Sequence, residues 1–130
     1  MLFTSYAVAA AAILGAAAGA AASRGLQGKT TLKAYIVTEV DVTGDMAAFQ
    51  RDYAAHAQGT VEQFGGRYVA RGGRVFGTEG APPKGRIVIS EFPSFEDAKA
   101  WRVSAAYTKI VTVREREATS RQYIVEGVGG

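Results

Sequence analysis

Between residues 33 and 126 the sequence alternates between two kinds of hydrophobic spacing, and their order restricts the fold. Four segments rich in Val, Ile, Thr and Tyr favour strands: 33–42, 67–71, 86–92 and 121–126. Two segments repeat apolar residues at steps of three and four, as amphipathic helices do: 46–64 and 95–118, the second with a break near Ser104. The predicted element order is therefore β-α-β-β-α-β.

Caps and turn residues mark where these segments begin and end. Asp45 and Ser94 stand directly before the two helical segments and are predicted N-caps. Two consecutive prolines in residues 80–85 predict a loop, because proline cannot donate to a sheet ladder. We expect the glycines at 72–73 to bulge or bend the second strand, which then continues over residues 74–78.

This order is typical of a ferredoxin-like sandwich of the α+β class, in which helices cover one face of a four-stranded antiparallel sheet. A sheet covered on one side usually alternates cleanly between apolar and polar residues. Here the strands are apolar on both sides: Ile87 and Ile89 share one face of segment 86–92, and Val88 and Phe92 share the other. We therefore predict a homodimer in which a second copy covers the open face of the sheet.

The first 28 residues differ in composition from the domain predicted at residues 29–128. All 15 Lys and Arg and all 12 Asp and Glu residues follow Ser23, and residues 7–22 contain only Ala, Val, Ile, Leu and Gly. A helix of that length rises about 24 Å, less than the roughly 30 Å of a hydrocarbon core. We therefore predict a signal peptide and linker, cleaved near Ala22 or Ser23, and a periplasmic or secreted domain. The alternative is a membrane anchor formed by residues 7–22, which would make the membrane a partner.

Composition also excludes several kinds of site. The chain has no cysteine, and His56 is its one histidine, so thiol chemistry and a site of several histidines are excluded. We expect neither a metal nor a cofactor. A net charge of +3 with both signs interspersed predicts no nucleic-acid partner. Residues 23–30 nearly match a phosphate-binding loop, but Ser23 replaces its first glycine and the segment lies in the predicted linker, so the match is interpreted as chance.

Several segments resemble the family of domains of unknown function 1330. They are KAYIVTEVDV, FGGRYVARGG, PPKGRIVISEFPSFEDAKAW, WRVSAAY and YIVEG, and the resemblance covers about residues 32–128. It implies a dimeric α/β barrel, in which two ferredoxin-like sheets pack face to face, and it implies no activity. Proteins that share this barrel include cofactor-independent monooxygenases and haem-handling enzymes, which is an analogy of fold.

Seven side chains are candidates for a ligand site between the sheet and the helices: Tyr53, His56, Arg71, Glu91, Trp101, Tyr107 and Arg114. His56 is the candidate general base, because imidazole titrates near neutral pH. The simpler interpretation places His56 at the boundary of the core with one hydrogen bond. Trp101 and Tyr107 are most simply core residues, with an aromatic wall around a small ligand as the alternative.

Two groups of arginines require partners. Arg114 lies inside the apolar stripe of its helix, where an unpaired guanidinium is costly. It could pair with Glu91, reach solvent near the helix end, or bind an anion. Arg67 and Arg71 are four residues apart in a strand, so they should share a face. We expect them to pair across the sheet with acidic residues, and a clamp for a carboxylate or phosphate is the alternative.

Three functions remain open from the sequence. The first is a protein that binds a small apolar-to-anionic ligand, with Arg71 or Arg114 fixing the negative group. The second is a cofactor-independent enzyme of the monooxygenase or isomerase type that uses His56 as base. The third is a structural or interaction module without a ligand. An open cavity beside His56 would favour the first two.

Overall fold

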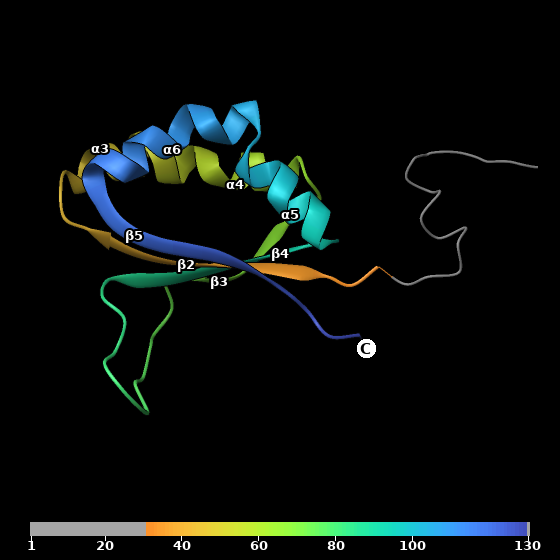
Figure 1. Cartoon of the computed structure of the whole chain (residues 1–130). Helices are drawn as coiled ribbons and strands as arrows, with labels where there is room; N and C mark the ends of the chain where they lie inside the picture. The colour runs from red at the N-terminus through yellow and green to blue at the C-terminus, as the bar shows by residue number, and fades with distance from the viewer. Residues whose placement is uncertain (1–30, 130) are drawn as a thin grey trace, which may run out of the picture. The chain divides into compact units, whose positions relative to one another are not determined.

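The computed structural model describes residues 31–129, which form one layer of helices on one sheet (Figure 1). The elements in chain order are β2 (Ala34–Val42), α3 (Met46–Phe49), the π-helical segment η1 (Gln50–Ala54), α4 (Ala55–Glu62), β3 (Arg67–Arg71), β4 (Arg86–Phe92), α5 (Phe95–Arg102), α6 (Ala105–Glu117) and β5 (Ala118–Glu126). The predicted leader at residues 1–28 lies outside the described residues, and so does segment 23–30, the near match to a phosphate-binding loop. Within residues 31–129 no helix is long and apolar enough to cross a membrane.

The four strands form an antiparallel sheet in the order β3-β4-β2-β5. The central pair, β2 and β4, runs in register from Ala34 opposite Phe92 to Val40 opposite Arg86. All helices cover the same face of this sheet (Figure 1). The predicted α+β class and the β-α-β-β-α-β order are therefore confirmed.

The core lies between this face and the helices. Ala34, Ile36, Thr38 and Val40 alternate along β2 and are all buried, as the period of two predicts. Above them the ring of Trp101 lies 4.0 Å from that of Tyr107 and 5.6 Å from that of Phe92, measured between centroids. The same core cluster includes the buried side chains of Ala34, Ile36, Val61, Ala98 and Val111.

The first helical segment begins and ends where the sequence predicts but is not a uniform α-helix. The Asp45 side chain accepts a hydrogen bond from the backbone N–H of Ala48 at 3.1 Å, which confirms the N-cap. Gly65 ends the segment with a φ of 76°, a conformation that favours glycine. In between, the N–H of Ala55 donates to the carbonyl of Gln50, five residues back, so η1 is a π-helical turn. The prediction of one regular amphipathic α-helix over residues 46–64 is therefore wrong at this turn.

The second strand is shorter than predicted. Residues 72–85 form a long loop that extends from the sheet on the side away from the helices, so the predicted continuation over 74–78 is wrong (Figure 1). The irregularity lies at Val69, because Tyr68 pairs with Ser90 and Ala70 pairs with the next residue of β4, Ile89. Val69 is therefore the extra residue of a β-bulge.

The junction between α6 and β5 also differs from the prediction. The segment 110–113 is helical, as the spacing indicates, but the helix ends at Glu117. Ala118, predicted in the helix, has an extended backbone and begins β5. The Glu117 carbonyl accepts hydrogen bonds from the N–H groups of Thr43 and Gly44 at 3.1 and 2.8 Å. These contacts tie the end of α6 to the start of the first helix.

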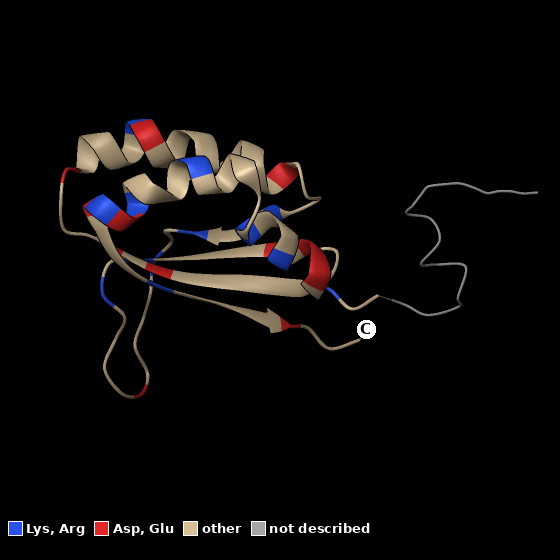
Figure 2. Ribbon diagram, turned by 45° about the horizontal axis from the view of Figure 1, so that its top comes forward, with Lys and Arg blue, Asp and Glu red and all other residues tan. Residues whose placement is uncertain are grey.

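The open face of the sheet has an apolar centre. Its apolar side chains come from the three strands β2, β4 and β5: Tyr35, Val37, Ile87, Ile89, Tyr123 and Val125. The Tyr123 and Val125 side chains are 46% and 49% exposed. Charged residues lie mainly on the helices, the loops and near the strand ends (Figure 2). This face therefore has the apolar character that the sequence predicts.

Candidate functional site

A small cavity lies between η1, α4 and the helix-facing side of the sheet. Its volume is about 50 Å³. The lining residues are Thr38, Val40, Phe49, Tyr53, Ala54, Ala57, Val61, Tyr68, Arg71, Arg86, Val88, Ser90, Trp101 and Gln122. A water molecule takes about 30 Å³ of liquid and a drug-sized ligand about 300 Å³ or more, so this volume holds water or one small group. The lining includes two arginines and no carboxylate.

The cavity adjoins a hollow of about 430 Å³ on the protein surface. The residues around this hollow are Gln50, Ala54, Ala55, Gln58, Arg71 and Arg86. Ala54, Arg71 and Arg86 line both spaces, so the hollow is the approach to the cavity. We call the cavity and this hollow together the arginine mouth.

Arg71 is held at the mouth by the neighbouring helix. Its Nη2 donates to the Ala54 carbonyl at 3.0 Å, and its guanidinium lies 4.3 Å from the centroid of the Tyr68 ring. The bulge at Val69 places Arg71 on the helix side while Arg67 stays on the open side, so the prediction that they share a face is wrong. Of the predicted cross-strand pairs, Arg67 with Glu91 is confirmed at 3.0 Å.

Arg86 also lines the site, although it is not among the candidates predicted from the sequence. It is half-buried and lies 5.9 Å from the centroid of the Phe49 ring. Among residues 31–129 neither Arg71 nor Arg86 forms an ion pair with a carboxylate. Arg86 alternates with Val88 and Phe92 on the face that meets the helices. The alternation of residues along β4 could therefore have predicted that Arg86 faces the helices. In the same way, the apolar stripe of its helix predicted an inward position for Arg114.

Tyr53 and Tyr107 form a buried hydroxyl pair at the inner end of the site. Their oxygens are 2.6 Å apart. Burial raises the pKa of Tyr53, the Tyr107 hydroxyl raises this pKa further, and the Arg114 guanidinium opposes the rise. Tyr53 comes from the π-helical turn, and such turns are frequent at functional sites. Tyr53 and Trp101 line the cavity, and Tyr107 is packed directly behind them.

Arg114 is buried, with 4% of its surface exposed, and its Nε has no hydrogen-bond partner in the part of the chain that the structure describes. The predicted pair with Glu91 is wrong, because Glu91 lies on the open face. There it contacts Arg67, Lys33 and the Tyr35 hydroxyl, at 3.0, 3.6 and 3.2 Å. The Arg67 hydrogen bond lowers the pKa of Glu91. With 4% of its surface exposed, Arg114 does not extend out into solvent, and an anion stays the untested alternative.

His56 does not reach this site. It lies on the exposed side of α4 and is absent from the lining of the cavity, so the predicted placement against the cavity is wrong. The helical step from Tyr53 was too coarse to place His56, because the π-helical turn changes the phase of the residues that follow it. No group of three or more histidine and acidic side chains suited to a metal occurs among the described residues.

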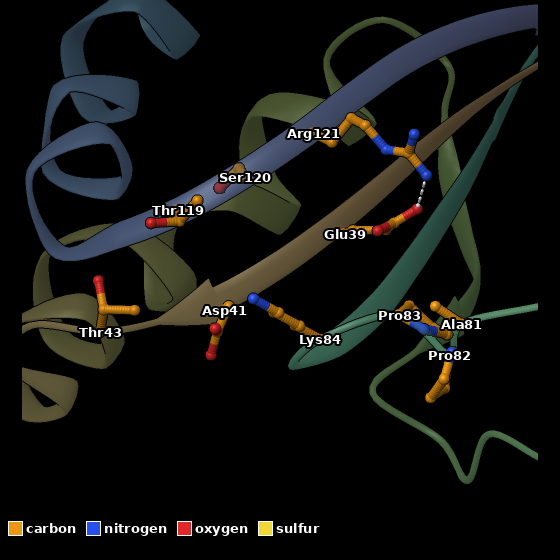
Figure 3. A pocket seen from close by; sticks show the side chains of 10 residues that line it. All are labelled: Glu39, Asp41, Thr43, Ala81, Pro82, Pro83, Lys84, Thr119, Ser120 and Arg121. Carbon is orange, nitrogen blue, oxygen red and sulfur yellow. Dashed lines mark hydrogen bonds and ion pairs between the residues drawn. The ribbon is translucent and has the colours of Figure 1, made fainter.

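A second, larger hollow of about 780 Å³ lies on the open face (Figure 3). It is lined by Glu39, Asp41, Thr43, Ala81, Pro82, Pro83, Lys84, Thr119, Ser120 and Arg121. Arg121 Nη2 donates to Glu39 Oε2 at 2.6 Å across this hollow (Figure 3). Its charges are of both signs and partly paired, unlike those of the arginine mouth.

Comparisons with known proteins agree with this architecture. The profile of the family described as a domain of unknown function (DUF1330) matches residues 33–128. A protein of unknown function from Rhodopseudomonas palustris has a TM-score of 0.60 and 16% identity, over 83% of this chain and 92% of that one. SnoaB, a cofactor-independent oxygenase from Streptomyces nogalater, has a TM-score of 0.51 and 12% identity, over 77% of this chain and 97% of that one. No curated protein matches the chain.

The sheet order, with the helices on one face, defines the class as a ferredoxin-like α+β domain, and the solved structures that it resembles share this fold. Because the family profile covers residues 33–128, the chain belongs to the DUF1330 family. The resemblance noted from the sequence is therefore confirmed. The two solved structures are so distant in sequence that they establish the fold alone.

Proposed function

We propose that this chain forms a homodimeric small-molecule-binding domain and that its ligand is a small organic anion held at the arginine mouth. The observation that carries the proposal is the pair Arg71 and Arg86, which line the same space without a carboxylate in the lining. A guanidinium presents a planar fork of donors that fits a carboxylate or phosphate. The hollow of about 430 Å³ has room for the anionic group.

The polar groups inside the cavity support a ligand with a small polar end. Thr38, Ser90 and Tyr68 line it with hydroxyl groups, and the amide of Gln122 is held by a 2.9 Å hydrogen bond to Thr38. A cavity of about 50 Å³ holds one small group of a ligand, which would take the place of bound water. The body of the ligand therefore stays in the hollow, between the two arginines and the glutamines of the first helix.

The open face supports the homodimer. Its centre is apolar, and four of its charged side chains form the pairs Arg67–Glu91 and Arg121–Glu39, while Asp41 lies toward its edge near the end of β2. Paired charges are less costly to cover than unpaired ones, so a second copy can pack there. The loop of residues 72–85 extends on the same side and carries the exposed Phe76 (Figure 1).

We also propose that the mature domain is exported, on the composition of residues 7–22. Native mass spectrometry of protein purified from its own cell envelope tests three parts of the proposal in one experiment: the dimer, the cleavage of the leader and the bound anion. The expected result is a dimer of chains that begin near Ala22 or Ser23, with a retained small anion. A monomer of full-length chains without a bound molecule would contradict all three parts.

Calorimetric titration with a panel of small carboxylates and phosphate esters tests the site directly. Arg71→Gln and Arg86→Gln are each expected to weaken binding about tenfold or more, because each removes one charged donor. The matched control is Arg74→Gln in the exposed loop, which removes the same charge away from the mouth. Equal binding by all three variants would contradict the site, and no binding by the parent chain would favour a structural module.

A second candidate is a cofactor-independent oxygenase, the activity for which SnoaB is named. The observation that favours it is the buried hydroxyl pair of Tyr53 and Tyr107 beside Arg114, which could hold a phenolate-like substrate. The exposed position of His56 removes the base considered from the sequence. Oxygen uptake with an electron-rich phenol, abolished by Tyr53→Phe and unchanged by His56→Ala, is the expected result. Uptake no faster than the uncatalysed rate would reject this candidate.

A further inference from the structure

A groove of about 510 Å³ lies between α6 and the edge strand β5, and it is distinct from the arginine mouth. Its walls are formed by Arg102, Arg114, Glu115, Ala118, Ser120, Gln122, Tyr123 and Ile124. Gln122 lines both this groove and the cavity and therefore separates them. No residue of the mouth other than Gln122, and thus neither Arg71 nor Arg86, belongs to the groove.

Arg114 is the unusual member of this groove, because it is 4% exposed and its Nε has no partner within residues 31–129. Its guanidinium lies 5.9 Å from the centroid of the Tyr53 ring, a contact that compensates only part of the cost of removing a charge from water. No carboxylate within the described part of the chain forms an ion pair with it. A buried charge without a counter-ion indicates that the counter-ion comes from outside the chain.

Arg102 brings a second guanidinium to the same groove. Its Nε donates to Gln122 Oε1 at 2.7 Å, and its guanidinium lies 5.3 Å from the centroid of the Tyr107 ring. Because Nε makes this bond, the two terminal nitrogens are left for a ligand. Glu115 is the carboxylate in the lining, and it is exposed, so the groove carries an excess of positive charge.

We propose that this groove binds a phosphate group, with Arg114 and Arg102 as its two cationic ligands and the Ser120 hydroxyl as a neutral donor. A doubly charged tetrahedral oxyanion neutralises both arginines, and the planar fork of each guanidinium fits two of its oxygens. The site goes beyond the proposed function, because it uses arginines that the mouth does not. The phosphate is either free inorganic phosphate or the phosphate of a small ester.

Thermal unfolding of the full chain against inorganic phosphate, and separately against a simple phosphomonoester, tests the site. The parent chain is expected to gain in unfolding temperature with phosphate as mass action requires, and to gain less or nothing with chloride at equal ionic strength. Arg114→Gln is expected to weaken phosphate binding about tenfold or more. The matched control, Arg116→Gln, removes an exposed arginine of the same helix and should leave the affinity within about twofold of the parent.

Each result decides the proposal. A stronger gain with the ester than with inorganic phosphate identifies an organic phosphate as the ligand, and equal gains identify free phosphate. If Arg114→Gln does not fold, Arg102→Gln gives the decisive affinity, and it should also fall severalfold. Unchanged phosphate binding in the variant that folds, or an equal gain with chloride, overturns the site. Arg71→Gln should bind phosphate at the groove as the parent does, which separates this site from the mouth.

Discussion

At the scale of single residues, the hydroxyl of Thr60 links two helices above the cavity. It accepts a hydrogen bond from Trp101 Nε1 at 3.0 Å and donates one to the Ala57 carbonyl at 2.7 Å. All three groups are buried, so each bond replaces a contact with water that the folded protein no longer makes. The indole ring that lines the cavity is therefore held by its polar atom as well as by packing.

Replacement of Thr60 by valine keeps the side-chain shape and removes this acceptor. The indole N–H is then buried without a partner, and the free energy of unfolding should fall by about 1–3 kcal/mol. Urea denaturation measures the change. Thr60→Ser keeps the hydroxyl and should retain more of the stability than Thr60→Val. A valine variant as stable as the parent would show that the indole N–H finds another acceptor.

Tyr53 and Tyr68 give the domain a distinct response to alkaline pH. Burial raises the pKa of both phenols, so the folded state keeps them neutral where the unfolded state ionises them, above about pH 10. Between these pKa values the unfolded state binds fewer protons, so the free energy of unfolding falls as pH rises. Their contribution is fully present below the ordinary tyrosine pKa and is lost above it.

Tyrosinate absorbance and denaturation on the same samples test this response. The native protein should show fewer ionised tyrosines than the unfolded protein at the same alkaline pH. Tyr53→Phe should make the loss of stability above pH 10 less steep. Ionisation of every tyrosine in the still-folded chain would contradict the burial of these two hydroxyls.

At the scale of elements, Gly85 determines how the long loop joins β4. Its φ is 71°, and a Cβ atom there would overlap the Val40 carbonyl oxygen and lie 2.6 Å from the Asp41 Cα. Gly80 has nearly the same backbone conformation, with a φ of 73°, but open space around it. Substitutions at these two glycines therefore measure two contributions to stability separately. Gly80 reports the strain of the left-handed backbone alone, and Gly85 reports that strain together with a steric overlap.

Gly80→Ala should cost about 1–2 kcal/mol, because it pays only for a left-handed backbone. Gly85→Ala should cost about 3 kcal/mol or more, because the overlap with β2 adds to that strain. Chemical denaturation of the two variants measures the difference. Equal losses at both positions would mean that the loop moves away from β2 without cost.

Elements were predictable where a single residue marks them. Asp45, Ser94 and Gly65 define helix ends through their own side chains or backbone preferences, and all three act where the sequence places them. The π-helical turn and the bulge have no such marker. The π-helical turn rotates the residues that follow it by a fraction of a turn, and the bulge shifts the strand alternation by one residue. Hydrophobic spacing over a whole segment is too coarse to detect either change. The misplacement of His56 and Arg71 has this cause.

At the scale of the whole molecule, the order of the segments was sufficient to predict the fold, since few arrangements of β-α-β-β-α-β pack well. The side-chain partners across the sheet were harder to predict, because they depend on the register between strands that are distant in the sequence. Glu91 faces Arg67 and Tyr35 through two strand pairings that neither segment specifies alone. The arginine mouth combines residues of the first helix, β3 and β4 in the same way.

The proposed dimer gives Phe76 a role at this scale. Phe76 is 89% exposed, so Phe76→Ser should leave the stability of the single subunit unchanged and weaken the dimer about tenfold. Sedimentation equilibrium over a range of concentrations measures the association. The matched control is Val103→Ser, which removes an exposed apolar side chain (77%) between α5 and α6, away from the open face. Equal association of both variants with the parent would exclude Phe76 from the interface.

The bulge at Val69 has a consequence for the comparison of related sequences. Because Val69 is the surplus residue, a chain that lacks it has its two arginines three positions apart and still directs them to opposite faces. Deletion of this valine should therefore preserve both the Arg67–Glu91 contact and the place of Arg71. A one-residue gap between the two arginines of β3 in an alignment is therefore compatible with their placement on opposite faces of the sheet.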